Sequence, residues 1–402
     1  MASDRAEPIL SLYVHVPFCA QKCSYCAFYS EASNGDLINS YIDALTTEME
    51  RVHAEVRPNT IFFGGGTPSI LNLRQWERVL RTMDRLGLTG AKEWTIECNP
   101  ATVSADKAKL LRDFGVNRIS MGVQSLDAAL LDRLGRVHTR EMAFKSYEIL
   151  RRAGFANVNL DLMFAIPGQT LRVWQQTLRE VVQLESEHLS AYEVIYEEDT
   201  PLYESLKAGK IREDEDLACG MFDELLEAAE GAGFRRYEVA NFARDRSCSG
   251  QPHQDQPESP QKQNRGDPSH ACQHNLNYWR GGSFVGLGPS ATTYVGGVRT
   301  KNWPNTQRYC EELKAGHRPI ESREQLSPLS RAGETAAFGL RMVDGWPFEE
   351  FEKVTGYDLR REWAGEMKEL VARGWGRITA ENFQLTQQGL RFADAAAELF
   401  LR

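Results

Sequence analysis

Three cysteines lie within eight positions near the N-terminus, in the spacing C-x-x-x-C-x-x-C: Cys19, Cys23 and Cys26. Three thiolates this close together can hold a cube-like iron–sulfur cluster, because they supply three ligands and leave the fourth iron open. Structural zinc normally takes four ligands, so zinc would need a further partner such as His15. Unrelated buried thiols are a third interpretation, and the spacing alone leaves all three open.

Further downstream, polar residues and glycines stand at the ends of apolar, β-rich runs such as IFFGGGTPS, EWTIE and ISMGV. Glycines let a bound molecule approach the backbone and expose its N–H groups, although a lone glycine run is more often a tight turn. A carboxylate inside an apolar strand needs a partner if it is buried, which makes it a stronger indication of a site. The residues in question are Gly65, Gly66, Thr67, Glu97, Gln124, Arg136 and Asp161.

The elements that must position these residues alternate between β-rich runs and helical patterns over the first 240 residues. Ser104 and Thr170 each precede an apolar stripe of helical spacing and can cap a helix, and Gly115 can end the first of these helices. Alternating strands and helices predict parallel β/α units, here six or seven, and hence a closed or partial barrel. In barrels the chemistry lies at the C-terminal ends of the strands, where these residues stand.

The composition divides the chain further. The segment RDRSCSGQPHQDQPESPQKQNRGDPS has almost nothing to bury and predicts a flexible surface insertion. Two or three helices and a short hairpin near the C-terminus predict a winged-helix-like module, which we interpret as a lid or docking element. We therefore predict four regions: a barrel core over 1–242, the insertion over 243–269, a barrel extension over 270–325 and the C-terminal module over 326–402.

Composition and charge exclude several classes of protein. The 402 residues carry 47 basic and 56 acidic side chains, a net charge of −9, which argues against nucleic-acid binding. No stretch approaches 18 uninterrupted apolar residues, so we expect no transmembrane segment and at most a peripheral membrane contact. The N-terminal MASDRAEPIL has no apolar signal region. With only eight cysteines and one tight cluster, we expect a cytoplasmic protein with metal or redox chemistry.

Taken together, the motifs resemble a known superfamily. The order C-x-x-x-C-x-x-C, GGGTP, a glutamate at a strand end, GVQS, an arginine in LGRVH and D-L-x-x-x-x-P-G-Q is similar to that of radical S-adenosylmethionine (radical SAM) proteins. More narrowly, GGGTPS, SMGVQS and HNLNYW resemble the branch of oxygen-independent coproporphyrinogen III oxidase and its relatives. The resemblance implies an α/β fold with a partial (β/α)6-type barrel, a smaller C-terminal α/β extension and the winged-helix-like helical module.

The resemblance also implies two cofactors. Cys19, Cys23 and Cys26 would hold a [4Fe–4S] cluster, and the amino and carboxylate groups of S-adenosylmethionine would chelate its open iron. By motif position, the S-adenosylmethionine contacts would be Tyr13, Tyr25, Gly65, Gly66, Thr67, Glu97, Gln124, Arg136 and Asp161. The residue types suit these roles: acidic side chains for the amine and ribose hydroxyls, Arg136 for the carboxylate and Tyr25 for adenine.

Two departures from the oxidase pattern point to the heme chaperone HemW family within this branch. The oxidase carries a further cysteine two residues after the third ligand, where this chain has Phe28, and it also has a longer segment before its first strand. The resemblance therefore implies a protein that carries heme to acceptor proteins of the respiratory chain. The alternative is the oxidase reaction, which decarboxylates coproporphyrinogen III to protoporphyrinogen IX. Enzymatic activity stays open, and we assign no catalytic residue.

The segment HNLNYW reproduces the H-N-x-x-Y-W motif of the heme-carrying relatives through His274, Tyr278 and Trp279. Without the resemblance, the segment would be interpreted as a buried, hydrogen-bonded histidine beside core aromatic residues. With it, we expect all three residues to bind heme, because a neutral imidazole is a good axial ligand of iron and aromatic rings offer flat apolar faces. Cys272 and His270 are close in sequence and stay open as competing ligands.

Overall fold

A computed structural model of the chain describes residues 9–245 and 267–402. Most of the predicted insertion, residues 246–266, lies outside the described residues. The centre of the fold is a nine-stranded sheet of order β11-β1-β4-β5-β6-β7-β8-β10-β9. Its six central strands run parallel: β1 (Ile9–Val16), β4 (Val56–Gly65), β5 (Glu93–Cys98), β6 (Arg118–Gln124), β7 (Val158–Phe164) and β8 (His188–Glu193).

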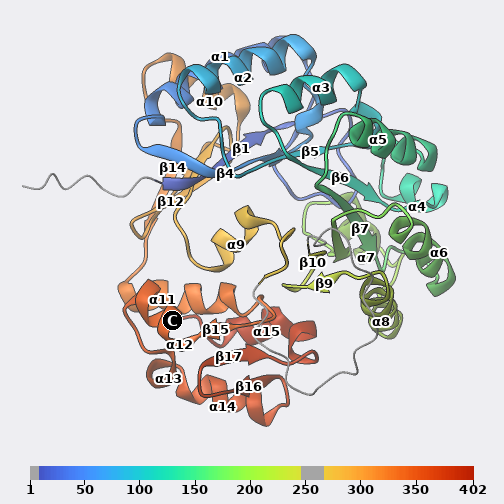
Figure 1. Ribbon diagram of the computed structural model, residues 1–402, viewed down its shortest axis with the longest axis vertical. Helices are drawn as coiled ribbons and strands as arrows, with labels where there is room; N and C mark the ends of the chain where they lie inside the picture. The colour runs from blue at the N-terminus through green and yellow to red at the C-terminus, as the bar shows by residue number, and fades with distance from the viewer. Residues whose placement is uncertain (1–8, 246–266) are drawn as a thin grey trace, which may run out of the picture.

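Three short strands extend this sheet at its two edges. β11 (Val285–Leu287) pairs parallel to β1, while β10 (Asn241–Ala243) and β9 (Arg235–Arg236) continue antiparallel beyond β8. In Figure 1 the strands form an arc, with helix α9 (Gln273–Trp279) on its inner side and the connecting helices on its outer side. The six parallel strands and their helices confirm the predicted α/β fold with a (β/α)6-type partial barrel.

The connecting helices begin where short polar side chains can cap them. Ser104 accepts a hydrogen bond from the Lys107 N–H, and Thr170 accepts one from the Val173 N–H, as the sequence predicts. Gly115 follows the first of these helices with a φ of +102°, which suits its predicted role as a stop. The helices are α1 (Gly35–Val52), α2 (Leu73–Arg85), α3 (Ala105–Asp113), α4 (Ala128–Arg133), α5 (Arg140–Arg152), α6 (Leu171–Val182), α7 (Pro201–Lys207) and α8 (Glu215–Gly231).

Side chains alternate strictly along the barrel strands, as the period of a strand requires. On β1, Leu12 and Val14 are fully buried in the main apolar core beneath the helices, and Ile61, Ile96 and Met121 belong to the same core. The residues between them point to the inside of the arc and are mostly polar. These inward side chains include Ser11, Tyr13, His15, Thr60, Glu93, Glu97, Arg118, Ser120, Asn159, Asp161, His188 and Ser190.

A second apolar core lies in the C-terminal part of the chain, around Trp346, Phe351 and Trp363. Helices and one small sheet of order β15-β17-β16 enclose it, as expected for a winged-helix-like module, although the predicted domain boundaries stay predictions. Its elements are α11 (Pro328–Gly339), β15 (Trp346–Pro347), α12 (Phe348–Thr355), α13 (Leu359–Glu362), α14 (Ala364–Ala372), β16 (Gly376–Ile378), β17 (Asn382–Leu385) and α15 (Ala393–Glu398).

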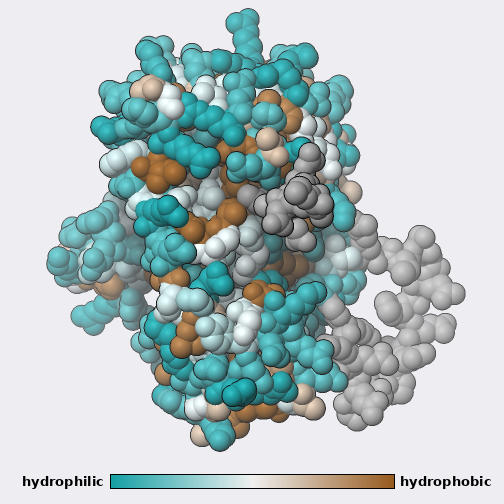
Figure 2. All heavy atoms as spheres, turned by 90° about the vertical axis from the view of Figure 1, so that its left-hand side faces the viewer, coloured by the Kyte–Doolittle hydropathy of each residue, from teal (hydrophilic) through white to brown (hydrophobic). Residues whose placement is uncertain are grey.

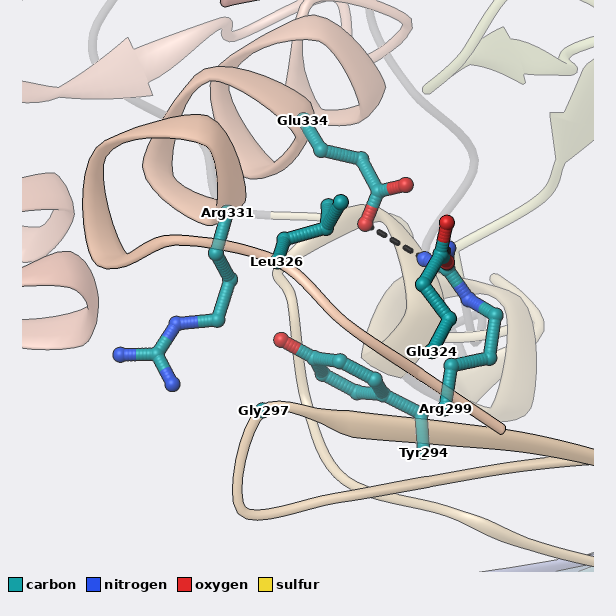
Figure 3. A pocket seen from close by; sticks show the side chains of 7 residues that line it. All are labelled: Tyr294, Gly297, Arg299, Glu324, Leu326, Arg331 and Glu334. Atoms are coloured by element: carbon teal, nitrogen blue, oxygen red, sulfur yellow. Dashed lines mark hydrogen bonds and ion pairs between the residues drawn. The ribbon is translucent and has the colours of Figure 1, made fainter.

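In the chain, the segment between the barrel and this module forms α10 (Thr306–Lys314), which packs beside α1, and a sheet of β12 (Thr292–Val295), β13 (Val298–Asn302) and β14 (Ile320–Gln325). Figure 3 shows how the sheet meets the module: Arg299 on β13 forms ion pairs with Glu324 on β14 and with Glu334 on α11. One arginine therefore links the sheet to the first helix of the module.

The surface is largely hydrophilic on the face shown in Figure 2, with separate, small apolar patches. Within the described ranges, no helix combines the length and the apolar character that crossing a membrane requires.

Candidate functional site

The cysteine loop follows directly after β1. Cys19 ends the short strand β2 (Phe18–Cys19), which pairs with β3 (Glu31–Ala32), while Cys23 and Cys26 close a turn between these strands. The Ser24 N–H donates to the Leu134 carbonyl, and the Ser24 carbonyl accepts from the Leu202 N–H. Segments that follow β6 and β8 thus hold the loop over the C-terminal ends of the barrel strands.

The three thiols lie within electrostatic range of one another. Burial raises the pKa of the Cys26 thiol, and the nearby Cys23 and Cys19 add to the increase. Among residues 9–245 and 267–402, no three His, Cys, Asp or Glu side chains converge on a point that could hold a single metal ion. The cysteines of a cubane cluster each bind a different iron, whereas the ligands of a zinc ion converge on one point.

His15 does not serve as a fourth ligand in this arrangement. Its Nε2 donates to the Tyr29 carbonyl at 2.9 Å, and its Nδ1 accepts from the Tyr13 hydroxyl at 3.1 Å. Burial lowers the pKa of His15 to about 4, so the imidazole is neutral and carries only the Nε2 proton. The histidine is part of the packing beneath the cysteine loop.

The glycine run at the end of β4 fits against the cysteine loop with no room for side chains. The Gly66 N–H donates to the Val16 carbonyl, and the Thr67 N–H donates to the Phe18 carbonyl, each at 2.8 Å. Gly65 has a φ of +100°, and a Cβ on it would come within 2.4 Å of the His15 ring. The glycines therefore let β4 approach the backbone that carries the cysteines.

Polar groups near the sulfur atoms come from two of the predicted residues. The Thr67 hydroxyl donates to Cys19 Sγ at 3.5 Å, and Arg136 donates to Cys23 Sγ at 3.6 Å and to the Gly122 carbonyl at 2.6 Å. Arg136 Nε is buried without a hydrogen-bond partner. A buried guanidinium with an unused donor is suited to an anionic group of a ligand.

Two carboxylates face the interior just below this loop. Burial raises the pKa of Glu97 to about 8, and repulsion from Asp161 adds to the increase. Asp161 accepts hydrogen bonds from the Ser120 hydroxyl at 2.9 Å and the Asn159 amide at 2.7 Å, and burial raises its pKa. Within the described ranges neither carboxylate forms an ion pair. This donor set fits a ligand that brings an amine or hydroxyls.

Gln124 and Tyr25 complete the group at the strand ends. Gln124 ends β6 with a φ of +61°, next to an irregularity in the pairing with β7. A non-glycine residue in the left-handed region is strained, and such strain is concentrated at functional sites. Burial raises the pKa of Tyr25 above its ordinary value, and the tyrosine lies close enough to Arg136 and Cys23 to interact with both.

Tyr13 lies deeper in the barrel than the other predicted contacts. Its ring stacks on Phe62, with 6.3 Å between ring centroids, and its hydroxyl binds His15. Its ring centroid is 6.5 Å from that of His274. Tyr13 therefore stands between the residues below the cysteine loop and helix α9.

Helix α9 fills the opposite end of the barrel interior, near the N-terminal ends of the strands (Figure 1). His274 is 1% exposed and stacks on Phe62 at 5.2 Å. Its Nδ1 is hydrogen-bonded to the Thr60 hydroxyl at 2.9 Å and its Nε2 to the Tyr278 hydroxyl at 2.8 Å. Burial lowers the pKa of His274 to about 3, so the imidazole is neutral. Both ring nitrogens are engaged inside the fold.

The other residues near the heme motif differ in their suitability as ligands. Cys272 is fully buried with its thiol directed at Glu93, and burial raises its pKa to about 12, so it is a poor source of thiolate. His270 precedes α9 and is partly buried. Trp279 faces the C-terminal module, where Arg341 lies 5.0 Å from its ring, and its Nε1 is buried without a partner.

The structure also reveals an interior hydrogen-bond network that the sequence analysis missed. His188 contacts the Asn159 amide oxygen through Nδ1 at 2.7 Å and the Tyr237 hydroxyl through Nε2 at 2.8 Å. The Asn159 amide donates in turn to Asp161, so the network extends toward the C-terminal ends of the strands, where the cysteine loop lies. Polar residues at every second position of the strands are the sequence signal that could have revealed it.

Comparisons with known proteins agree with the motifs. Residues 13–181 match the radical SAM superfamily, and residues 326–392 match the HemN C-terminal domain. The chain is 32% identical over 396 residues to "Heme chaperone HemW" of Lactococcus lactis, covering 97% of each chain. It is 32% identical over 406 residues to the heme chaperone HemW of Escherichia coli, covering 98% of each.

Among solved structures, the chain is similar to the coproporphyrinogen III oxidase HemN of Escherichia coli, with a TM-score of 0.81. The match covers 98% of this chain and 90% of that one at 20% sequence identity. At this identity the similarity establishes the shared fold and nothing about the reaction.

The glycine run gives a first prediction. Gly87, outside the run, serves as the control. In Gly87→Ala the new Cβ meets no atom within 4 Å, so the loss of stability comes only from the left-handed backbone (φ +69°) and is about 1–2 kcal/mol. In Gly65→Ala the contact with the His15 ring adds about 1–3 kcal/mol of overpacking. Urea denaturation of the two heme-free variants measures the difference. Equal losses of stability would show that β4 does not press on His15.

Proposed function

The chain belongs to the heme chaperone HemW family of the radical SAM superfamily, and we propose that it binds heme and transfers it to acceptor proteins. The similarity to heme chaperones along nearly the whole chain carries this proposal. It is supported by the H-N-x-x-Y-W segment, which lies on a helix inside the barrel. The proposal includes a cytoplasmic location, acceptors in the respiratory chain and at most peripheral contact with the membrane.

The superfamily implies a [4Fe–4S] cluster and S-adenosylmethionine. We assign the cluster to Cys19, Cys23 and Cys26. When bound, the reduced cluster supplies an electron that can cleave the sulfonium of S-adenosylmethionine. The assigned S-adenosylmethionine contacts are the nine residues named from the motifs. All of them except Tyr13 lie near the C-terminal ends of the barrel strands. Arg136, with its unused Nε donor, suits the carboxylate, and the carboxylates of Glu97 and Asp161, which form no ion pair within the described ranges, suit the amine and hydroxyls.

Phe28 favours the chaperone over the oxidase. It stands where the oxidase has its additional cysteine, and its side chain is 71% exposed. A phenyl ring can neither ligate iron nor transfer a proton or an electron as a thiol does. An exposed aromatic ring beside the cluster loop suits contact with a flat apolar ligand or with a partner protein.

The heme site that we propose includes His274, Tyr278 and Trp279. For His274 to bind iron, its Nε2 must exchange the Tyr278 hydroxyl for the metal. The two residues stand one helical turn apart on α9, and the Tyr278 ring also packs on Phe284, so heme binding would require the Tyr278 hydroxyl to leave Nε2. The neutral state of the imidazole is the one that ligates iron.

Heme titration tests the proposed function. We expect the anaerobically reconstituted protein to bind about one heme per chain with a Soret band, and to lose it to an apo-cytochrome when mixed. Absence of any heme-dependent spectral change would overturn the proposal. Formation of protoporphyrinogen IX from coproporphyrinogen III, with S-adenosylmethionine and a reductant, would establish the oxidase reaction instead.

The cluster assignment predicts a loss of colour on substitution of one thiol. Cys23→Ala removes a ligand, so we expect the broad iron–sulfur absorbance near 400 nm to fall by more than about half after reconstitution. Cys219→Ala, an exposed thiol on α8, is the matched control and should leave absorbance and iron content unchanged. A full spectrum in Cys23→Ala would contradict the assignment.

The raised pKa of Glu97 predicts that S-adenosylmethionine affinity depends on pH. Below pH 8 the free carboxyl is protonated, whereas the bound ligand favours the carboxylate, so affinity should fall by about tenfold per pH unit between pH 8 and pH 6. Calorimetric titration of the anaerobic protein measures this slope. Glu97→Gln should weaken binding at pH 8 and flatten the slope, while Glu141→Gln, an exposed residue of α5, should keep the slope of the unaltered protein. If the affinity of the unaltered protein does not change between pH 8 and pH 6, Glu97 does not contact S-adenosylmethionine.

A further inference from the structure

Helix α9 receives the cap on its first turn from a distant strand. Its N-cap residue, Cys272, makes no side-chain capping bond. Instead the Glu93 carboxylate on β5 accepts from the Gln273 N–H at 2.9 Å and the His274 N–H at 3.0 Å. It also accepts from the Cys272 thiol at 3.5 Å. The first turn of α9, His274 included, is thus fixed to the barrel wall by one buried side chain.

A buried arginine lies close enough to interact with Glu93. Glu93 is 6% exposed and Arg118, on the adjacent strand β6, is 2% exposed and interacts electrostatically with it. The Tyr237 hydroxyl accepts from the Cys272 N–H at 3.2 Å, which satisfies a further donor of the same turn. A carboxylate held this way gives a short helix a defined position inside a polar interior.

The imidazole of His274 is fixed separately, by Thr60 on β4. Thr60 Oγ1 lies 2.9 Å from His274 Nδ1 and 2.9 Å from the Ser11 hydroxyl. When Nδ1 donates to Thr60, Nε2 keeps its lone pair and accepts from Tyr278. That tautomer is the one that can bind iron through Nε2, and a hydrogen bond to the other ring nitrogen is the usual support of a ligating histidine.

We propose that Glu93 and Thr60 are positioning residues for His274, Glu93 by holding the start of α9 and Thr60 by holding Nδ1, so that Nε2 is the nitrogen offered to heme iron. The inference rests on the proposed heme binding and specifies its geometry. Neither residue touches the ligand, and each acts through His274.

Thr60→Val tests the role of Thr60, because it removes the hydroxyl and keeps the shape of the side chain. We expect heme affinity to fall about 10–100-fold, the range found when such supporting partners are lost, and the iron–histidine stretching frequency of the ferrous heme complex to decrease. Thr60→Ser restores the hydroxyl and should restore both. Thr46→Val is the matched control, because the buried Thr46 hydroxyl donates to the Ile42 and Asp43 carbonyls of its own helix α1. Unchanged affinity and frequency in Thr60→Val would overturn the role of Thr60.

Glu93→Gln tests the cap in the heme-free protein. The amide keeps the size of the side chain but loses its charge and one acceptor, so we expect hydrogen exchange at residues 273–279 to accelerate about tenfold. Exchange in α2, on the outer side of the sheet, should stay unchanged and so excludes a global loss of stability. Unchanged exchange in α9 would overturn the role of Glu93, and a Glu93→Gln chain that fails to fold leaves Thr60→Val to decide the proposal.

These measurements separate the inference from the proposed function. Failure of the unaltered protein to bind heme ends the proposed function, while the exchange experiment still tests the cap on α9. If the unaltered protein binds heme normally and Thr60→Val and Glu93→Gln behave as it does, the positioning roles of Thr60 and Glu93 are wrong and the proposed function stands.

Discussion

The inward faces of the six parallel strands carry polar and charged side chains, and each must find a hydrogen-bond partner away from bulk water. In an ordinary barrel these positions hold branched apolar residues that fill the interior. Here Ser11, Thr60, Glu93, Arg118 and His188 occupy them. Each buried polar group without a hydrogen bond would lower the stability of the fold. The segments that enter the barrel interior are therefore those that supply hydrogen-bond partners to these side chains.

The two ends of the interior meet this requirement differently. Toward the N-terminal ends of the strands, the fold supplies the partners itself: the start of α9 covers Glu93, and the His274 ring bonds to Thr60. Toward the C-terminal ends, Glu97 forms no ion pair within the described ranges, although Arg118 acts on it electrostatically, and Arg136 Nε keeps an unused donor. At the α9 end, heme binding to His274 would therefore replace a hydrogen bond that the fold already makes, whereas at the other end polar groups are arranged to be paired by a ligand.

Local spacing was enough to predict much of this architecture. The cysteine loop, the glycine run and the caps at Ser104 and Thr170 depend on neighbouring residues, and a linear sequence displays neighbours directly. The hydrogen-bond partners of Glu93 belong instead to the start of α9, and Gln273 is 180 residues later in the chain. Next to exposed Lys92 at the start of a strand, Glu93 has the pattern of a solvated glutamate. The same holds for His274. Its partner Thr60 lies 214 residues earlier in the chain, on the same strand as Phe62, and only the folded barrel brings them together.

The pairing of β11 with β1 has a consequence for how the chain is made. Leu12 stands opposite Val285, so β1 keeps one open edge until a segment more than 270 residues later in the chain has been synthesised. An unpaired edge is a template for aggregation, and contacts so distant in sequence slow folding. The edge of β1 is therefore unprotected until β11 has been made. The inward polar side chains stay accessible to water until α9 has been made and packs against them.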